Sequence, residues 1–479
     1  MAVTILHISD LHRDSGSQLT STTLLQSLLR DKMRFLSEGH ETPVLAVVSG
    51  DIVFGVRPLE EDADKKLAAQ YDEALGFLIA LTDEYFEGDR ERVIIVPGNH
   101  DVSMPHVKRA VKATPVPSDA EDKMRLVEDL FSYDTKFRWD WGSFSAYEIV
   151  YDAIYADRMA PFADFYGRFY RGKRTYSLDP AKQYVVHDFP DLGLAFLALS
   201  SCHQNDLYNR TGRIHPDALA QATGDMIKLS RLGRLGIGVW HHNIEGGPND
   251  NDYVDPEFLQ ILMDGMCMIG MHGHQHKPQL LEHRFSADQR QGISIISAGT
   301  LCGGPRSLPS GRLRSYNIIK LDINERKGTV FVRSMTNSDF SSPVWAGRHI
   351  PEFGGDSVDF KLIGEIQAPD AMAIASEADH LIRAGLHRQA FEAVKQNLNN
   401  QYLRRIALDA LLEMRDWSKI IENFSIPQNP REFVTLSTAY EESEIWTTLK
   451  ELHEGPFSQS QDLAVRQRID MMRATLQKV

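Results

Sequence analysis

The chain has 479 residues, 42% of them hydrophobic and 25% charged, and its formal net charge is -14. This composition is typical of a globular protein of two or three domains, and the negative charge excludes a broad basic surface that grips nucleic-acid backbones without sequence preference. Three scattered cysteines without CxxC spacing exclude a disulfide framework, and no apolar run reaches the roughly 20 residues needed to span a bilayer. We therefore expect a cytoplasmic protein without a membrane segment or an amino-terminal signal peptide.

The first hundred residues alternate between strand and helix. Apolar runs at residues 4–6, 44–48 and 93–96 predict strands, and residues 22–36 and 65–85 predict helices between them. This alternation predicts the start of a layered α/β domain. In such sheets the ligand-binding groups gather at the carboxyl ends of the strands. Side chains able to bind a metal ion follow the three strands, namely Asp10 and His12, then Asp51, then Asn99.

Residues 102–180 are rich in charged and aromatic residues, and we predict a mostly helical insertion there. Because this segment directly follows Asn99 and His100, we expect it to lie beside the candidate metal site. Its aromatic residues include Tyr133, Phe137, Trp139, Trp141, Tyr166, Phe169 and Tyr170, and its compact basic run holds Arg168, Arg171, Lys173 and Arg174. These side chains fit either a wall that stacks nucleobases and binds phosphates, or the insertion's own core with a solvated edge. We favour the second interpretation.

Strands resume after the insertion in sufficient number for two sheets. Apolar runs predict strands at residues 184–187, 194–199, 237–240, 266–271, 293–297, 316–321 and 329–333. The first domain is therefore predicted to cover residues 1–335. Two of these strands again end in metal-binding side chains, with His241 and His242 after one and His274 and His276 after another.

The last third of the chain has a different pattern. Residues 336–369, marked by Gly, Pro and Ser, predict a linker, and residues 370–479 predict a separate all-helical domain. The helices fit either an α-solenoid of hairpins, whose spacing reads as irregular, or an ordinary bundle. Because helix hairpins offer extended binding surfaces, we expect this domain to bind a protein partner or to form a homodimer.

The five strand-end segments follow the order D-x-H, G-D, G-N-H-D, H and G-H-x-H. This order resembles the calcineurin-like metallophosphoesterase superfamily, and the resemblance covers residues 1–335. It implies an αββα sandwich with two divalent metal ions at the strand ends. It also implies one metal bound by Asp10, His12, Asp51 and His276, and a second bound by Asp51, Asn99, His241 and His274. Family patterns favour His241 over His242 as the ligand.

The residue types agree with a two-metal site. Carboxylate, imidazole and amide ligands suit borderline divalent metals, and we expect Mn, with Fe, Zn or Ni as alternatives. Two neighbouring cations need a shared anionic ligand, and Asp51 suits this role. A hydroxide that bridges the metals would attack the phosphorus, and His100 would protonate the leaving group. Asp101 would hold the His100 imidazole and raise its pKa.

We therefore expect a phosphodiesterase that acts on a nucleic acid, as a nuclease, or on a nucleotide. One alternative is a phosphomonoesterase, including a phosphoprotein phosphatase. Another is a partner-recruiting helical module that carries a regulated phosphoesterase. Arg13, directly after His12, fits either a contact to a substrate phosphate or a solvated loop position.

Overall fold

The computed structural model describes residues 2–14, 19–132, 134–246, 252–304 and 308–476. The chain forms two compact units, one of Met1–Ser230 and Arg234–Ile366, the other of Arg231–Gly233 and Gln367–Val479. Within the described ranges, no helix combines the length and the apolar character that a membrane crossing requires.

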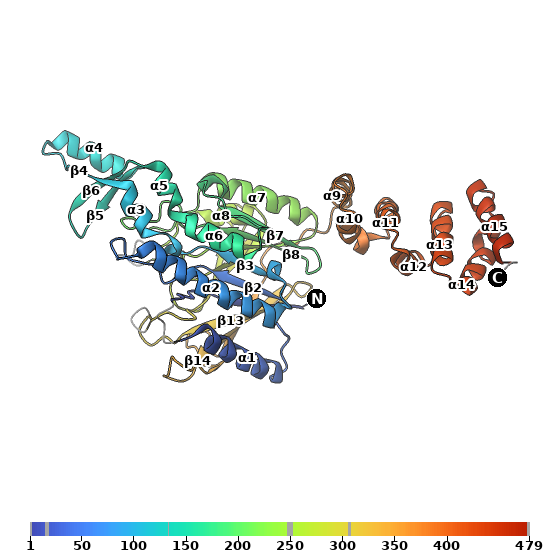
Figure 1. The fold of residues 1–479 in the computed structure, drawn as a ribbon, viewed down its shortest axis with the longest axis horizontal. Coiled ribbons are helices and arrows are strands. Elements are labelled where there is room, and N and C mark those ends of the chain that lie inside the picture. The colour runs from blue at the N-terminus through green and yellow to red at the C-terminus, as the bar shows by residue number, and fades with distance from the viewer. Residues whose placement is uncertain (1, 15–18, 133, 247–251, 305–307, 477–479) are drawn as a thin grey trace. The chain divides into compact units, whose positions relative to one another are not determined.

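Two sheets form the centre of the first unit (Figure 1). The seven-stranded sheet has the order β15-β14-β13-β1-β2-β3, and β16 also pairs with β14. Its strands are β1 (Ala2–Ile8), β2 (Leu45–Ser49), β3 (Val93–Val96), β13 (Ser315–Asp322), β14 (Lys327–Met335), β15 (Trp345–Gly347) and β16 (Ser357–Lys361). Strands β1, β2 and β3 run parallel, so their carboxyl ends meet at one edge.

The six-stranded sheet has the order β11-β12-β10-β9-β8-β7. Its strands are β7 (Tyr184–Phe189), β8 (Leu194–Leu199), β9 (Leu235–Val239), β10 (Cys267–His272), β11 (Gln279–Arg284) and β12 (Gly292–Ser297). The four inner strands are parallel, and β7 and β11 are antiparallel edges. Ile5 and Val47 of the first sheet share a buried cluster with Phe196 and Ile237 of the second, so the two sheets pack face to face.

Helices cover the outer face of each sheet. Leu28 of α1 (Ser21–Ser37) and Phe77 of α2 (Ala63–Phe86) are buried together with Val48, and α6 (Ala160–Phe169) joins the same cluster. On the other side, α7 (Pro216–Arg231) and α8 (Phe258–Asp264) bury Leu219 and Leu259 against the second sheet. The layers are therefore helix, sheet, sheet, helix, which confirms the predicted αββα sandwich.

The insertion, predicted to be mostly helical, also contains a three-stranded sheet. Helices α3 (Met104–Ala110), α4 (Ala120–Leu130) and α5 (Asp152–Ala156) are joined by β4 (Val111–Thr114), β5 (Phe137–Asp140) and β6 (Ser145–Ile149). The strands form an antiparallel sheet in the order β4-β6-β5. Strands of four or five residues carry too little periodicity to be recognised from the sequence. The described part of the first unit also contains the 3-10 turns η1 (Arg90–Arg92), η2 (Asn99–Asp101), η3 (Asp157–Met159) and η4 (Pro180–Lys182).

The predicted linker at residues 336–369 is corrected by the structure. Both β15 and β16 lie in this segment and pair with β14, so the first unit continues to Ile366 rather than ending at residue 335. Trp345 of β15 is fully buried, and its indole N–H donates to Ser27 Oγ of α1 at 2.8 Å. The Gly, Pro and Ser residues therefore belong to turns between short edge strands.

The second unit is a series of helix hairpins. Its helices are α9 (Ala371–Arg383), α10 (His387–Val394), α11 (Gln401–Met414), α12 (Trp417–Phe424), α13 (Pro430–Glu442), α14 (Trp446–Glu454) and α15 (Leu463–Leu476), with the turns η5 (Lys395–Asn397) and η6 (Pro456–Gln459). The helices of each hairpin pack on each other, in the pairs α9–α10, α11–α12 and α13–α14. Successive hairpins are joined by the contacts of α11 with α9 and α10 and of α13 with α12, and α15 packs on α13. This nearest-neighbour packing is that of an α-solenoid.

The hairpins recur more regularly than the sequence indicated. Asp370, Asn400, Asn429 and Asp462 each accept hydrogen bonds from backbone N–H groups at the start of a longer helix, and they are about 30 residues apart. The expectation of irregular spacing was wrong because hydrophobic positions were compared, whereas these helix caps are polar.

Candidate metal centre

All seven candidate metal ligands lie where strands of the two sheets end. Asp10 and His12 follow β1, Asp51 follows β2, and Asn99 begins the short turn η2 after β3. His241 follows β9 of the second sheet, and His274 and His276 follow β10. The parallel strands therefore deliver side chains from distant parts of the chain to one place.

Asp10, His12, Asp51 and His276 form the first cluster. His276 Nε2 lies 3.1 Å from Asp10 Oδ1 and 3.3 Å from His12 Nε2. His12 Nε2 is in turn 3.8 Å from Asp51 Oδ2 and 3.9 Å from Asp10 Oδ1. Burial, followed by the proximity of His100, lowers the pKa of His12 to about 4, so this ring is neutral and offers a lone pair.

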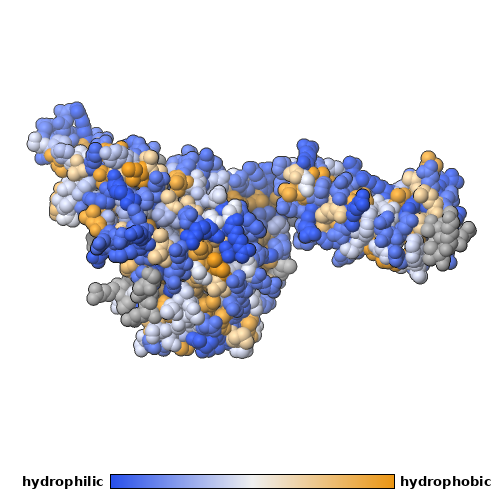
Figure 2. Space-filling view, in the orientation of Figure 1, coloured by the Kyte–Doolittle hydropathy of each residue, from blue (hydrophilic) through white to orange (hydrophobic). Residues whose placement is uncertain are grey.

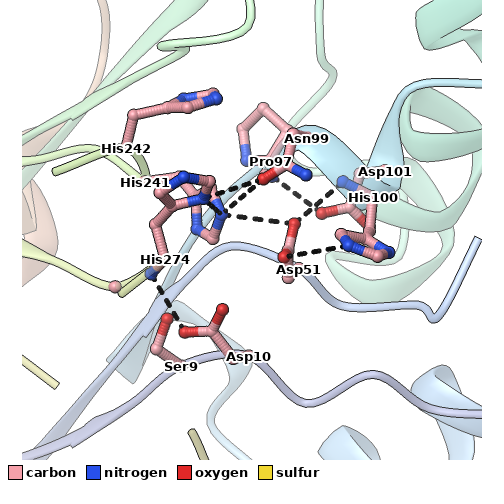
Figure 3. Close-up of polar contacts among 12 residues, drawn as sticks. Ser9, Asp10, Asp51, Pro97, Asn99, His100, Asp101, His241, His242 and His274 are labelled. Carbon is pink, nitrogen blue, oxygen red and sulfur yellow. Dashed lines mark hydrogen bonds and ion pairs between the residues drawn. The ribbon is translucent and has the colours of Figure 1, made fainter. Parts of the chain in front are cut away.

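Asp51, Asn99, His241 and His274 form the second cluster (Figure 3). Asn99 Oδ1 lies 3.1 Å from His241 Nε2 and 3.0 Å from His274 Nδ1, and these two ring nitrogens are 3.3 Å apart. His241 Nε2 is 3.3 Å from Asp51 Oδ1. Asp252 Oδ2 faces the other ring nitrogen of His274 at 3.4 Å, which leaves Nδ1 directed into the cluster.

Asp51 belongs to both clusters. Its Oδ1 faces His241, and its Oδ2 faces His12. A carboxylate in this position is able to give one oxygen to each of two cations. The structure thus brings the residues of each implied ligand set together, and Asp51 lies between the two sets.

The residues present fit divalent cations. The buried Asp10 Oδ1 faces the ring nitrogens of His276 and His12 at 3.1 and 3.9 Å, so acceptor lone pairs converge at this point. Imidazole nitrogens face each other across both clusters, where only one of each pair can carry a proton that the other accepts. Ligand atoms of Asp10, His12 and His276 and of Asp10, Asp51 and His241 each lie within 4.8 Å of one another. Two cations, one in each cluster, would bind these carboxylate and imidazole lone pairs.

The backbone of the candidate ligands is strained. Asp10, His12, Asp51, His274 and His276 all have positive φ, between 40° and 74°. Non-glycine residues rarely adopt this left-handed conformation, and it costs on the order of 1 kcal/mol or more per residue. Such strain persists only where the surrounding fold over-determines it, and it gathers at functional sites.

Gly98 and Gly273 lie so close to neighbouring residues that no side chain fits at either position. A Cβ atom at Gly98 would lie 2.2 Å from Asp51 Oδ1, and one at Gly273 would lie 1.8 Å from Ser9 Oγ. Both distances are far shorter than any van der Waals contact. The glycines that precede Asn99 and His274 therefore allow the strand-end loops to meet around the carboxylates.

His241 and His242 have different environments. His241 Nδ1 faces the Ser49 carbonyl at 2.7 Å, which fixes the ring with Nε2 in the second cluster. Both ring nitrogens of His242 are occupied, by Ser201 Oγ at 2.8 Å and Asn205 Nδ2 at 3.3 Å. Figure 3 shows the His242 ring directed away from Asp51.

His100 lies at the mouth of the site. Its Nδ1 donates to the Phe54 carbonyl at 2.6 Å, and its Nε2 lies 4.0 Å from Asp51 Oδ2. Phe54, whose side chain is exposed, gave no signal in the sequence because its backbone oxygen makes this contact.

The predicted contact between Asp101 and the His100 imidazole is corrected by the structure. The buried Asp101 carboxylate accepts from the backbone N–H of Gly98 at 2.8 Å and of Ile52 at 3.1 Å, and from Tyr71 Oη at 3.2 Å. Burial, followed by the nearby Asp51 carboxylate, raises the pKa of Asp101 to about 7. Asp101 therefore joins the turn after β2 to the turn after β3. It positions the candidate ligands Asp51 and Asn99, which lie in these turns, and not the His100 imidazole.

Arg13 fits neither of its two predicted roles. Its guanidinium is buried and donates to the Leu19 carbonyl at 3.0 Å, Ser21 Oγ at 3.2 Å and Glu73 Oε1 at 2.9 Å. It therefore ties the loop after β1 to α1 and α2.

The aromatic and basic residues at 162–174 form a core with a paired edge, as favoured. Tyr166, Phe169 and Tyr170 are buried against α2, while Arg168 and Arg174 pair with Asp72 and Glu91. Trp141, in contrast, lies on the surface of the insertion and is 73% exposed. Tyr133 lies outside the described residues.

A cleft of about 410 Å³ opens over the candidate metal ligands. Its lining includes Asp51, Asn99, His100, His274 and His276, together with Met104, Asn205, Asp206, Leu207, Arg210 and Asp252. Arg210 and Asp252 could not be predicted from the sequence, because they lie on loops without a recognisable pattern. Arg210 is exposed and is the only lysine or arginine in the described lining of the cleft.

A model of the calcineurin-like phosphoesterase family matches residues 3–278. No curated protein matches the sequence. Among solved structures, a dimetal phosphatase from Danio rerio is 12% identical and covers 69% of this chain and 96% of its own, with a TM-score of 0.37. The phosphoesterase YfkN from Bacillus subtilis is 12% identical, covering 81% and 98% with a TM-score of 0.29. A Vps29 variant from Entamoeba histolytica is 10% identical, covering 75% and 100% with a TM-score of 0.26.

Proposed function

This chain belongs to the calcineurin-like phosphoesterase family and is a hydrolase of phosphate esters, and from this premise we propose that it is a two-metal phosphodiesterase acting on a nucleic acid or nucleotide. The matched residues 3–278 contain all seven candidate ligands.

Asp10, His12, Asp51 and His276 would hold one divalent ion, and Asp51, Asn99, His241 and His274 the other. When bound, the two ions neutralise charge on the phosphoryl oxygens and lower the pKa of water. We propose Mn because the ligands combine carboxylate, imidazole and amide oxygen without a thiolate.

His100 would donate the proton that the leaving group needs. Its Nδ1–H is engaged by the Phe54 carbonyl at 2.6 Å, so Nε2 is the nitrogen that faces the cleft. A leaving alkoxide is strongly basic, and a proton from a positioned imidazolium typically accelerates such a step by about 10²–10⁴-fold.

The charged side chains that line the cleft support a diester as the substrate. Among the described lining residues outside the candidate ligands, Arg210 is the one arginine or lysine, and it is accompanied by Asp206 and Asp252. A phosphomonoester brings a dianion with three terminal oxygens, whereas a diester brings a monoanion with two. One guanidinium is a fitting partner for the latter.

The test is Mn-dependent hydrolysis by the wild type and by Asp51→Asn. The panel holds a chromogenic diester, the matching monoester, cyclic nucleotides, and labelled single- and double-stranded DNA and RNA. We expect wild-type cleavage of diesters, lost in Asp51→Asn. Activity confined to the monoester would replace the diesterase by a phosphomonoesterase or phosphoprotein phosphatase.

The second unit supports a further proposal, that it recruits a protein partner or forms a homodimer. Consecutive hairpins present an extended surface, and Met372, Ile426 and Leu463 are each more than two-thirds exposed. Light scattering on the full chain and on a chain ending at Ile366 tests the homodimer. We expect a dimer that the shorter chain loses, and a monomeric full-length protein would contradict it.

A further inference from the structure

The loop at residues 204–210 joins the insertion to the lining of the metal cleft. Asn205, Asp206 and Arg210 of this loop line the cleft, and Arg210 is exposed. In the part of the first unit where Figure 1 draws α4, β5 and β6, Figure 2 shows apolar residues interrupting a hydrophilic surface. This surface faces solvent, whereas the contacts that the insertion makes with the loop are mostly buried.

Asp206 is the residue by which the insertion holds the loop. Its fully buried carboxylate accepts from Arg138 Nε of β5 at 2.7 Å and from Tyr155 Oη of α5 at 2.6 Å. Arg138 Nη2 also donates to Tyr155 Oη at 2.9 Å, so each of the three groups contacts the other two. A buried, charge-assisted network of this kind is strong while all of its members are present.

The same carboxylate closes the turn that leads to Arg210. Its Oδ1 accepts from the backbone N–H of Tyr208 at 2.8 Å and of Asn209 at 3.0 Å, while Oδ2 faces the insertion. The backbone N–H of Asp206 donates in turn to the Asn209 carbonyl at 2.8 Å. An aspartate that accepts from backbone N–H groups two and three residues further on fixes the direction of the chain. Arg210 therefore follows directly on a turn that Asp206 holds.

Asn205 holds Arg210 from the side of the metal ligands. Its Nδ2 donates to the Arg210 carbonyl at 2.9 Å and lies 3.3 Å from His242 Nε2. His242 follows the candidate ligand His241, and its Nδ1 lies 2.8 Å from Ser201 Oγ. His242 thus connects the loop to the strand end that carries His241.

Two further contacts between the insertion and the loop are made by Tyr208. Lys108 Nζ of α3 donates to Tyr208 Oη at 3.2 Å, and Tyr147 of β6 is stacked on the Tyr208 ring, with the centroids 4.6 Å apart. With Arg138 and Tyr155, the contacts come from four elements of the insertion, namely α3, β5, β6 and α5. The insertion therefore holds this loop at several points.

We infer that Asp206 is a positioning residue for Arg210 and that Arg138 and Tyr155 of the insertion support it, which rests on the proposed diesterase function in which Arg210 binds the substrate phosphate. Both oxygens of Asp206 are already engaged, so Asp206 acts on the substrate only through Arg210. An arginine whose backbone is fixed in advance loses less conformational entropy on binding a phosphate than one on a free loop.

A double-mutant cycle on kcat/KM for the diester tests this with Asp206→Asn and Arg210→Ala. Asp206→Asn keeps an oxygen for the turn but loses the charge that pairs with Arg138. It should lower kcat/KM by about 3- to 30-fold, chiefly by raising KM. In the Arg210→Ala background it should change kcat/KM by less than about 2-fold, because the group through which Asp206 acts is gone. Equal losses in the two backgrounds would overturn the inference.

Tyr155→Phe covers the case in which loss of the buried charge unfolds Asp206→Asn. It removes one hydrogen bond to Asp206 and keeps the pair with Arg138, so kcat/KM should fall by about 2- to 10-fold, again only while Arg210 is present. The matched control is Asp31→Asn, which removes an equally buried carboxylate that pairs with Arg333 and does not line the cleft. It should lower the thermal stability and leave KM unchanged.

Hydrogen–deuterium exchange gives a measurement that does not depend on catalysis. A peptide covering residues 204–213 should exchange faster in Asp206→Asn and in Tyr155→Phe than in the wild type, because the turn loses its support from the insertion. Unchanged exchange in both variants would overturn the inference. Faster exchange in the variants of a protein that hydrolyses no diester would confirm that Asp206 holds the loop and contradict the diesterase function, so the two failures are distinguishable.

Discussion

At the scale of single residues, the candidate metal ligands are held by a backbone in the unfavourable left-handed conformation. Asp10, His12 and Asp51 have left-handed conformations, and Asp101 secures the turns around them through backbone N–H groups. The candidate ligands were predictable because each follows an apolar strand. The contacts of Asp101 and Arg13 were not, since a buried polar side chain finds its partners only in three dimensions.

His100→Gln should have an effect that depends on the leaving group. If His100 supplies the proton, hydrolysis of a nucleoside or alkyl diester should slow by about 10²–10⁴-fold, whereas a nitrophenyl diester, whose leaving group needs no proton, should change little. Comparing kcat for the two substrates measures this. An equal loss for both would assign His100 to binding or to the metals instead.

Arg210→Ala should lower kcat/KM for the diester by about 10- to 100-fold, because a charge-assisted hydrogen bond to a phosphoryl oxygen contributes roughly 1.5–3 kcal/mol. Arg210→Lys should recover part of this, since the charge is kept and the forked geometry is lost. Steady-state kinetics at saturating Mn test this prediction. Unchanged kinetics in both variants would place the substrate phosphate away from Arg210.

At the scale of elements, buried ion pairs connect helices to sheets. Asp31 of α1 accepts from Arg333 Nε and Nη2 of β14, both at 2.8 Å, and from Tyr316 Oη of β13 at 2.5 Å. The Asp31 side chain is fully buried, and that of Arg333 is 3% exposed. The edge of the first sheet is thus fixed to the helical layer.

Asp31→Asn should reduce the free energy of unfolding of the first unit by up to about 3–5 kcal/mol, because it removes the buried counter-charge of Arg333 and leaves only its ion pair with the half-exposed Glu38, at 2.9 Å. The matched control is Asp152→Asn, which removes the carboxylate of the exposed Lys136–Asp152 pair and should cost about 1 kcal/mol or less. Denaturant titration followed by circular dichroism compares the two. Similar losses for both variants would contradict the buried-pair argument.

Elements were predicted unevenly from the sequence. The parallel strands have continuous apolar runs, because both of their faces are covered, and they were recognised as strands. Strands β15 and β16 were not recognised, because three and five residues carry little pattern and pair only with the distant β14. The insertion sheet was missed for the same reason.

At the scale of the whole molecule, the boundary between the units decides which shorter chains fold. A chain ending at Ile366 keeps β15 and β16, whereas one ending at residue 335 loses both, together with the buried Trp345. We expect the longer form to unfold cooperatively and the shorter one to be destabilised by at least about 3–5 kcal/mol, as for loss of a buried tryptophan. Equal thermal stability of the chains ending at Ile366 and at residue 335 would instead support the predicted domain boundary at residue 335.

The second unit should lose stability in mild acid through His453. Burial, followed by Arg468 and Arg473, lowers the pKa of His453 from 6.5 to about 4, and Ser437 Oγ lies 2.8 Å from its Nε2. The unfolded chain binds a proton below pH 6.5 and the folded one does not, so stability falls as the pH drops from 6.5 towards 4. The expected loss is roughly 1 kcal/mol at pH 5, allowing for solvent screening.

His453→Gln tests this directly, because an amide keeps an acceptor for Ser437 but does not titrate. Thermal unfolding between pH 7.5 and pH 5 should show a smaller fall for the variant than for the wild type. Other buried histidines contribute equally to both proteins, so the difference isolates His453. Parallel pH curves would exclude it as the titrating group.

The regular spacing of the helix caps in the second unit affects how insertions and deletions can change its length during evolution. Asp370, Asn400 and Asn429 each start one long helix and its short partner, and each hairpin packs on its neighbours. A duplication or deletion running from one cap to the next adds or removes a whole hairpin without exposing a new kind of interface. The length of this unit can therefore change in steps of about 30 residues, each step being one complete hairpin.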